Sequence, residues 1–199
     1  MGGTRDPIGV VLAGGEGRRI GGGKAVVELC GRPLLRHPLR VLQAVLADVV
    51  VVAKADTELP PLPGVPVWTE PDEPRHPLAG VVYALRQAEG RAVLVCAGDL
   101  PFASAQLVER LVRADAGGAP AVVPRADGRL QPLLARYEPA ALPALAAALA
   151  SRPAVSLTSA VSSLSPCVLE LDDERPFFNV NTSADLETAA AMLGRHRAP

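Results

Sequence analysis

The chain has 199 residues, of which 49% are hydrophobic and 21% are charged, and its formal net charge is −1. That length suits one ordinary domain with a buried core, and near-neutral charge excludes a broad basic field for indiscriminate nucleic-acid binding. No apolar run reaches the ~18 residues that span a bilayer, and the opening MGGTRDP has no signal-peptide pattern. We therefore expect a soluble, cytoplasmic protein that binds neither nucleic acid nor a membrane.

Cysteine and lysine usage narrows the chemistry further. The three cysteines, Cys30, Cys96 and Cys167, lie far apart and form no CxxC pair, so a zinc site and a disulfide framework are both disfavoured. Lysine is scarce, because only Lys24 and Lys54 among the 20 basic residues are lysines. A lysine inside a motif is therefore of particular interest.

Short apolar segments alternate with helical ones along the chain. Continuous apolar runs predict strands over residues 8–13, 49–53, around 67, 92–97, 121–123, 133–137 and 168–171. Helical spacing of apolar residues predicts helices over 34–47, 78–89, 104–114, 139–150 and 183–193. Pro38 should bend or delay the first of these helices, and Ser104 is a candidate N-cap for the third.

This alternation predicts an α/β fold: a single doubly wound, mostly parallel, Rossmann-like sheet with helices on both faces. We expect one domain over residues 8–193, with a disordered N-terminus at 1–7 and a flexible tail at 194–199. No segment in the middle of the chain reads as an interdomain linker.

The first predicted strand runs into a glycine-rich loop, LAGGEGRRIGGGK, at residues 12–24. Glycine lets backbone amides approach an anion closely, so such a loop can cradle phosphates, and Arg18, Arg19 and Lys24 add three cations. The loop matches neither GxGxxG nor the Walker pattern, since Ile20 replaces the third glycine of the former and Ala25 follows Lys24. The alternative is a merely flexible loop in a glycine-rich chain.

Two further segments carry candidate site residues. In VLVCAGDLPF, residues 93–102, Asp99 follows a buried strand directly, and a carboxylate there suits Mg²⁺ bound to phosphate oxygens. The alternative is a turn in which Asp99 caps the local backbone. In FFNVNTSADLETA, residues 177–189, Asn179 and Asn181 flank a strand end, and Thr182 with Asp185 fits a capping box.

These segments, with CGRPLLRH, HPLAG and GRLQPLLARY between them, resemble the successive motifs of the molybdenum cofactor guanylyltransferase family of nucleotidyltransferases. The resemblance covers residues from about 8 to 193, and its double glycine after Ala13 is similar to the guanylyltransferase branch. It implies a nucleotide-diphospho-sugar-transferase-type fold. It also implies GMP transfer from GTP to molybdenum-molybdopterin, giving the guanine dinucleotide cofactor and pyrophosphate, with Mg²⁺ as cofactor.

The resemblance also implies roles for particular residues. Arg19, Lys24 and Asp99 would be catalytic, with Asp99 holding the metal, and Asn179 and Asn181 would lie on the pterin side. Lys54 stands where the family often has a nucleotide-contacting asparagine, and the family's acidic nucleotide contact is matched by Glu70 or Asp72, of which we prefer Glu70. The nucleotide-binding set implied by the resemblance is Leu12, Ala13, Gly14, Gly15, Lys24, Lys54, Glu70 and Asp99.

Other functions stay open at this point. A related nucleotidyltransferase could use CTP or a different acceptor, such as a sugar phosphate or phospholactate. A noncatalytic nucleotide-binding protein would bind without turnover. The resemblance further implies transient contact with other proteins of molybdenum cofactor biosynthesis, or with the apoenzymes that receive the cofactor.

Overall fold

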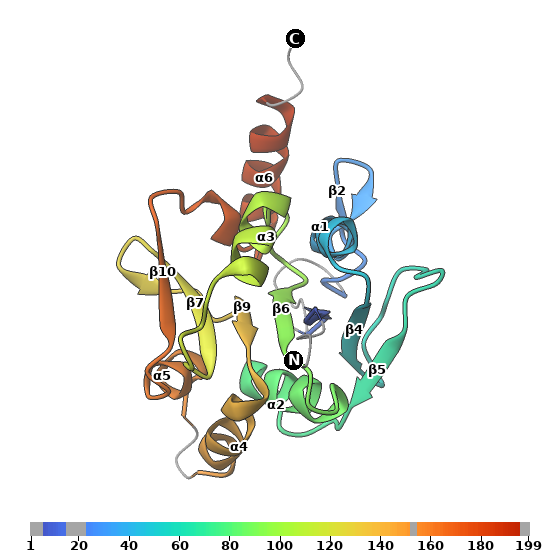
Figure 1. The fold of residues 1–199 in the computed structure, drawn as a ribbon. Coiled ribbons are helices and arrows are strands. Elements are labelled where there is room, and N and C mark those ends of the chain that lie inside the picture. Colours follow the sequence, from blue (N-terminus) through green and yellow to red (C-terminus); the bar gives the residue numbers. More distant parts are fainter. Residues whose placement is uncertain (1–5, 15–22, 152–154, 196–199) are drawn as a thin grey trace.

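A computed structural model of the chain describes residues 6–14, 23–151 and 155–195 (Figure 1). Most of the predicted terminal segments, residues 1–5 and 196–199, therefore lie outside the described residues. None of the described helices is long and apolar enough to cross a membrane.

One eight-stranded sheet forms the centre of the fold, in the order β10-β7-β9-β6-β1-β4-β5, with β8 paired to β7. Its middle strands are buried along their whole length, as their continuous apolar sequences predicted. A separate two-stranded hairpin is made of β2 (Glu28–Leu29) and β3 (Arg32–Pro33). The sheet strands are β1 (Ile8–Leu12), β4 (Val49–Lys54), β5 (Val67–Glu70), β6 (Val93–Ala97), β7 (Ala121–Ala126), β8 (Arg129–Leu130), β9 (Leu134–Tyr137) and β10 (Cys167–Leu171).

The sheet is mostly parallel, as the sequence predicted. Strand β1 pairs in parallel with β4 and β6, and β4 pairs in parallel with β5. Strand β9 runs antiparallel between β6 and β7, so β7 and its parallel partner β10 run in the same direction as β1. Only β9 and the short β8 are reversed within this sheet.

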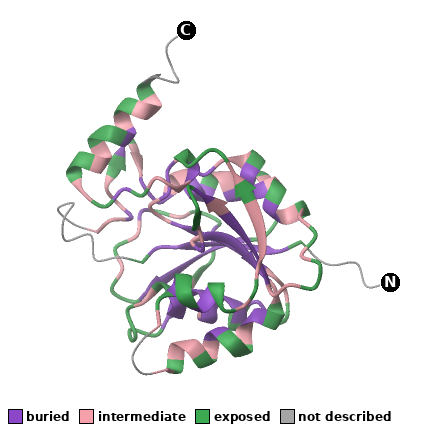
Figure 2. Cartoon of the chain, turned by 90° about the vertical axis from the view of Figure 1, so that its left-hand side faces the viewer, coloured by how far each residue is buried: buried purple, intermediate pink, exposed green. Residues whose placement is uncertain are grey.

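Helices cover both faces of the sheet (Figure 1). Helices α1 (Arg36–Val45) and α3 (Ala105–Arg113) pack on one face, while α2 (Pro77–Gln87), α4 (Leu142–Ala150) and α5 (Leu157–Ser162) pack on the other. The buried strands lie between these two layers (Figure 2). The last helix, α6 (Ser183–Arg195), packs on the β2–β3 hairpin through a small apolar cluster. Two short 3₁₀ turns span Pro139–Ala141 and Arg175–Phe177.

The structure differs from the sequence prediction in a few elements. Helix α1 begins at Arg36, so Pro38 lies in its first turn, where a proline costs no intrahelical hydrogen bond. Strand β7 continues through Pro124, which is paired with Leu169 of β10 and whose O accepts from Gln131 N at 2.8 Å. The hairpin β2–β3, strand β8 and helix α5 were not predicted.

Register places the ends of the central strands together. Leu12 at the end of β1 lies opposite Ala97 at the end of β6, and Gly98 N–H donates to Leu12 O at 2.9 Å. A Cβ on Gly98 would lie 3.1 Å from Leu12 O and 2.7 Å from Leu35 Cδ1. The close approach of the two strand ends therefore requires glycine at position 98.

We predict that Gly98→Ala lowers the free energy of unfolding by about 1–3 kcal/mol, because the added methyl group overpacks the junction between β1 and β6. Gly194→Ala is the matched control, since a Cβ there would meet nothing within 4 Å. Chemical denaturation of both variants measures the difference. A Gly98→Ala variant as stable as the wild type would contradict this account of the junction.

Candidate nucleotide-binding site

The end of β1 opens a small hollow at the carboxyl edge of the sheet. Leu12 and Ala13 are buried and Gly14 is exposed, with open space where a Cβ would stand. Gly15 and Arg19, both predicted site residues, lie outside the described residues, and the chain is described again from Gly23. The hollow is lined by Leu12, Ala13, Gly14, Lys24, Ala25, Leu35, Gly98 and Asp99.

Lys24 and Asp99 meet in this hollow although 75 positions separate them in the sequence. Lys24 Nζ donates to Asp99 Oδ2 at 2.5 Å, and the two side chains are only 11% and 16% exposed. Asp99 reaches this place because it follows β6 by two residues, beside the end of β1. The structure therefore brings together two residues that the sequence predicted for phosphate and metal binding.

One oxygen of Asp99 is buried without a hydrogen-bond partner. Among the described residues, no donor bonds Asp99 Oδ1, whereas Oδ2 accepts from Lys24. A buried carboxylate oxygen without a partner is costly unless a cation or a donor engages it. The described residues include no group of three or more His, Cys, Asp and Glu side chains that could hold a metal. Such a site suits a cation that takes most of its other ligands from phosphate and water.

Asn181 adds a third polar group beside Lys24. Its Oδ1 accepts from Lys24 Nζ at 2.7 Å. The backbone of Asn181 is held by Asp185, whose Oδ2 accepts from Asn181 N at 2.9 Å and from Thr182 N at 2.8 Å. The Asn181 N–H, together with the Thr182 hydroxyl, lowers the pKa of the Asp185 carboxyl. Since Asp185 N donates to Thr182 Oγ1, the predicted capping box is present and fixes Asn181 at the start of α6.

Asn179 faces a different space, a cavity of about 360 Å³ next to the hollow. Val180 N donates to Asp99 O at 3.1 Å, so the segment carrying both asparagines is tied to the end of β6. The two spaces adjoin, because Asp99 lines the hollow and Leu100 lines the cavity. The cavity is lined by His76, Pro77, Leu100, Leu130, Gln131, Pro132, Leu133, Leu134, Ser156, Leu157, Thr158, Phe177 and Asn179.

Lys54 and Glu70 lie at the neighbouring strand ends. They are paired across β4 and β5, and both are buried. Burial raises the pKa of the Glu70 carboxyl above its ordinary value, and the Lys54 ammonium opposes that rise. Asp72, the alternative acidic residue, lies exposed in the loop after β5. Of the two candidate acidic residues, Glu70 is therefore the buried one at the end of a sheet strand, and Asp72 is exposed to solvent.

Four polar residues of the cavity were not predicted as site residues: His76, Gln131, Ser156 and Thr158. His76 and Gln131 belong to the HPLAG and GRLQPLLARY segments, which were quoted only as motifs. Ser156 caps α5 and Thr158 lies within it, and α5 was not predicted at all. The sequence signal for Gln131 was its place in the GRLQPLLARY segment. No local pattern distinguishes Ser156 or Thr158 from ordinary helix-start residues, and Ser156 does cap α5 by accepting from Ser159 N.

The arrangement combines charges of opposite sign at the same strand ends. The Lys24 ammonium can neutralise a phosphate, the backbone of residues 12–14 lies beside it, and the Asp99 carboxylate can hold a cation. In an open α/β sheet this carboxyl edge is where ligands bind. The geometry therefore fits a bound nucleotide whose phosphates lie between a lysine and a cation held by a carboxylate.

The family described as "MobA-like NTP transferase domain" matches residues 9–165 of this chain. A protein named molybdenum cofactor guanylyltransferase from Acidiphilium cryptum is 36% identical over 191 residues, covering 92% of this chain and 93% of that protein. A protein of the same name from Cereibacter sphaeroides is 35% identical over 190 residues, covering 94% of this chain and 96% of that one.

Two solved structures are also similar to this chain over most of its length. The crystal structure of molybdopterin-guanine dinucleotide biosynthesis protein A from Archaeoglobus fulgidus matches with a TM-score of 0.73 and 26% identity, covering 94% of this chain and 98% of that one. The 2-C-methyl-D-erythritol 4-phosphate cytidylyltransferase from Thermus thermophilus matches with a TM-score of 0.69 and 26% identity, with the same coverage. The sheet order and the Lys24–Asp99 contact are consistent with the family match and with these relatives. The chain therefore belongs to the MobA-like nucleotidyltransferase family.

Proposed function

We propose that this chain transfers GMP from GTP to molybdenum-molybdopterin, giving the molybdopterin guanine dinucleotide cofactor and pyrophosphate. The observation that carries the proposal is the Lys24–Asp99 contact in the hollow at the end of β1. The names of the most similar relatives supply the base and the acceptor. The proposal includes a cytoplasmic location and transient contact with proteins that supply the acceptor or receive the product.

The nucleotide occupies the hollow in this proposal. Backbone groups of Leu12, Ala13 and Gly14 hold it, with Gly15 continuing the same loop, and Gly14 leaves the open space that a close phosphate or base requires. Lys24 neutralises the phosphates, and Arg19 assists from the glycine-rich loop. Lys54 and Glu70 lie nearby, at the ends of β4 and β5.

Asp99 is the residue that would hold Mg²⁺. Its unpartnered Oδ1 supports this assignment, because a hard cation binds carboxylate oxygens readily and keeps its remaining positions for phosphate and water. When bound, the ion supplies positive charge to the triphosphate at the α-phosphate and the leaving pyrophosphate.

The acceptor occupies the adjoining cavity. Asn179 lines that cavity from the segment between β10 and α6, and Asn181 contacts Lys24 on the hollow side. A terminal phosphate held between the two asparagines would lie near both spaces. We therefore assign Asn179 and Asn181 to the acceptor side, with Gln131, Ser156 and Thr158 as additional polar groups of the wall.

The reaction needs positioning and charge neutralisation more than covalent chemistry by the protein. A terminal phosphate oxygen of the pterin forms a bond to the α-phosphorus of GTP. The bond from that phosphorus to the oxygen leading to the β-phosphate breaks, and pyrophosphate leaves with the bonding pair. Lys24 stabilises charge on the transferring group, while Asn181 keeps the Lys24 ammonium oriented.

A second candidate is transfer of CMP, or transfer to another acceptor. The observation that favours it is the structural similarity to a cytidylyltransferase, which has the same identity as the guanylyltransferase-pathway structure at a slightly lower TM-score. The two candidates share Lys24 and Asp99 and differ in the base. Base selection follows from hydrogen bonds that the wrong base leaves unpaired.

We predict that GTP with Mg²⁺ raises the melting temperature and that CTP does not. At a ligand concentration about 100 times Kd, binding stabilises the folded state by about 2.7 kcal/mol, which for a chain of this length is a shift of roughly 5–11 °C. Thermal-shift titration with each nucleotide measures it. Stabilisation by CTP without stabilisation by GTP would reject GTP as the donor.

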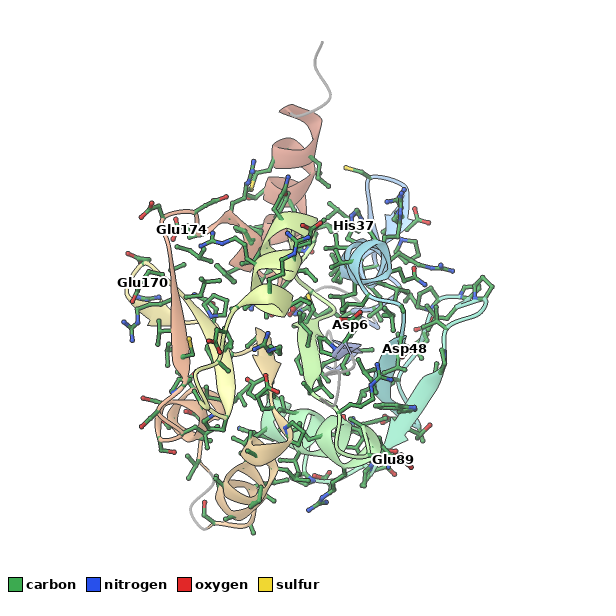
Figure 3. The ribbon with its side chains drawn as sticks, viewed as in Figure 1. Asp6, His37, Asp48, Glu89, Glu170 and Glu174 are labelled. Atoms are coloured by element: carbon green, nitrogen blue, oxygen red, sulfur yellow. The ribbon has the colours of Figure 1, made fainter. Side chains whose placement is uncertain are left out.

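We predict that Asp99→Asn abolishes pyrophosphate release from GTP in the presence of the pterin acceptor, because the amide cannot hold the cation as a carboxylate does. Glu170→Gln is the matched control. Glu170 also pairs with a cation, Arg125 at 2.7 Å, but it lies on the edge strand β10 far from the hollow (Figure 3). Unaltered turnover of the Asp99→Asn variant would remove Asp99 from the site.

We predict that Asn179→Ala raises the KM for the acceptor about tenfold while the KM for GTP stays unchanged, since one hydrogen bond to the acceptor is lost. Gln87→Ala, at the exposed end of α2, is the control for loss of a surface amide. Steady-state kinetics with each substrate varied in turn separates the two KM values. A rise in the KM for GTP alone would move Asn179 to the nucleotide side.

A further inference from the structure

A buried ion pair lies at the ends of β4 and β5, near the end of β1. Lys54 is the last residue of β4, Glu70 is the last residue of β5, and the parallel register places them opposite each other. Lys54 Nζ lies 3.6 Å from Glu70 Oε1, and the two side chains are 8% and 9% exposed. Burying two ions costs free energy that their attraction returns only in part. The other contacts of Lys54 must therefore account for its position.

The Lys54 ammonium makes its printed contacts with groups of the protein itself. Lys54 Nζ donates to Pro71 O at 2.6 Å and to Pro74 O at 3.5 Å, and it forms an ion pair with the Glu70 carboxylate. An ammonium group has three donors and no acceptor. The Lys54 ammonium is therefore engaged by two loop carbonyls and by the charge of Glu70, and not turned toward the hollow lined by Lys24 and Asp99.

The segment that Lys54 holds leads directly into α2. Pro74 O also accepts from His76 N at 3.0 Å, and His76 Nδ1 accepts from Leu78 N at 3.2 Å as the N-cap of the helix. Lys54 thus fixes the loop at Pro71 and Pro74, and the fixed loop sets where α2 begins.

The start of α2 and Glu70 both lie against the end of β1. A Cβ on Gly80 of α2 would lie 3.2 Å from Leu12 Cδ2 and 3.7 Å from Glu70 Oε2. Glu70 Oε1 faces Lys54, so Oε2 is the oxygen turned toward Leu12 and Gly80. Of the two charged groups, Glu70 is the one that lies near Leu12, which lines the hollow.

We infer that Lys54 is a positioning residue that holds Glu70 and residues 71–76 in place at the edge of the nucleotide site, and that it is not itself a nucleotide ligand. This inference rests on the proposed function, since it takes a nucleotide to occupy the hollow beside Leu12. Lys54 acts on the nucleotide only through Glu70, whose position Lys54 and the loop fix together.

The test is a double-mutant cycle on GTP affinity, using Lys54→Met, Glu70→Gln and the double variant, with Kd measured by titration calorimetry. Each single substitution should raise the Kd for GTP about tenfold. The double variant should bind no more weakly than Glu70→Gln alone, because Lys54 acts through Glu70.

Arg136→Met is the matched control for losing a buried cation. Arg136 donates to the carbonyls of Leu111, Val112 and Ala114 at the end of α3 and to Glu138, as Lys54 donates to loop carbonyls and Glu70. Its partner in the sheet is Leu94, near the start of β6 and therefore at the opposite end from Asp99. Arg136→Met should lower stability and leave the Kd for GTP unchanged.

Two results would overturn the inference. Additive losses in the cycle would mean that Lys54 contacts the nucleotide directly, and a Lys54→Met variant that loses stability but keeps its GTP affinity would mean a purely structural role. If Lys54→Met does not fold, Lys54→Gln replaces it, since the amide keeps a donor for Pro71 O.

Hydrogen exchange provides a readout that needs no nucleotide. Exchange at the amides of Leu78 and Ala79 should be faster in Lys54→Met than in the wild type, and unchanged exchange would overturn the inference. A wild type that binds CTP in place of GTP would reject only the proposed function, and the same cycle is then measured with CTP.

Discussion

The parallel pairing of β1 with β6 is the constraint on which the site depends. Leu12 lies opposite Ala97, and the hydrogen bond from Gly98 N to Leu12 O continues the pairing past the strand ends. Because Gly98 has no side chain, the two loops that follow the strands leave the sheet in contact. That contact places Asp99 where Lys24, returning from the glycine-rich loop, can reach it. A register shift of one residue would separate the two groups and turn the strand side chains to opposite faces.

The two charges of the hollow are held by elements far apart in the sequence. Lys24 is bound by Asp99 after β6 and by Asn181 before α6, and Asn181 is itself fixed by the capping box of that helix. The last helix therefore contributes to the site through its first turn, although its body packs on the β2–β3 hairpin. On the other side of Leu12, the Lys54–Glu70 pair fixes the start of α2. The polar contacts around the end of β1 thus come from the ends of β4, β5 and β6 and from the starts of α2 and α6.

Much of this could be predicted from the sequence because its signals are local. The apolar runs of β1, β4 and β6, the Ser104 cap of α3 and the Thr182–Asp185 box all depend on neighbouring residues. Strand direction and pairing depend on the whole chain, so the reversal of β9 and the passage of β7 through Pro124 had no local signal. The same holds for the site. Asp99 and Lys24 could be predicted as site residues from their motifs. The contacts of Lys54 could not, because its ammonium donates to the carbonyls of Pro71 and Pro74, which lie far from it in the sequence.

In the proposed reaction, the hollow and the adjoining cavity together transfer GMP to a pterin. The most direct measurement incubates the full chain with Mg²⁺, molybdenum-molybdopterin and GTP labelled at the α-phosphate, and analyses the products by chromatography and mass spectrometry. We expect the label to enter a pterin guanine dinucleotide, with one pyrophosphate released for each dinucleotide formed. Label that stays in GTP while α-labelled CTP is transferred to the same acceptor would contradict it.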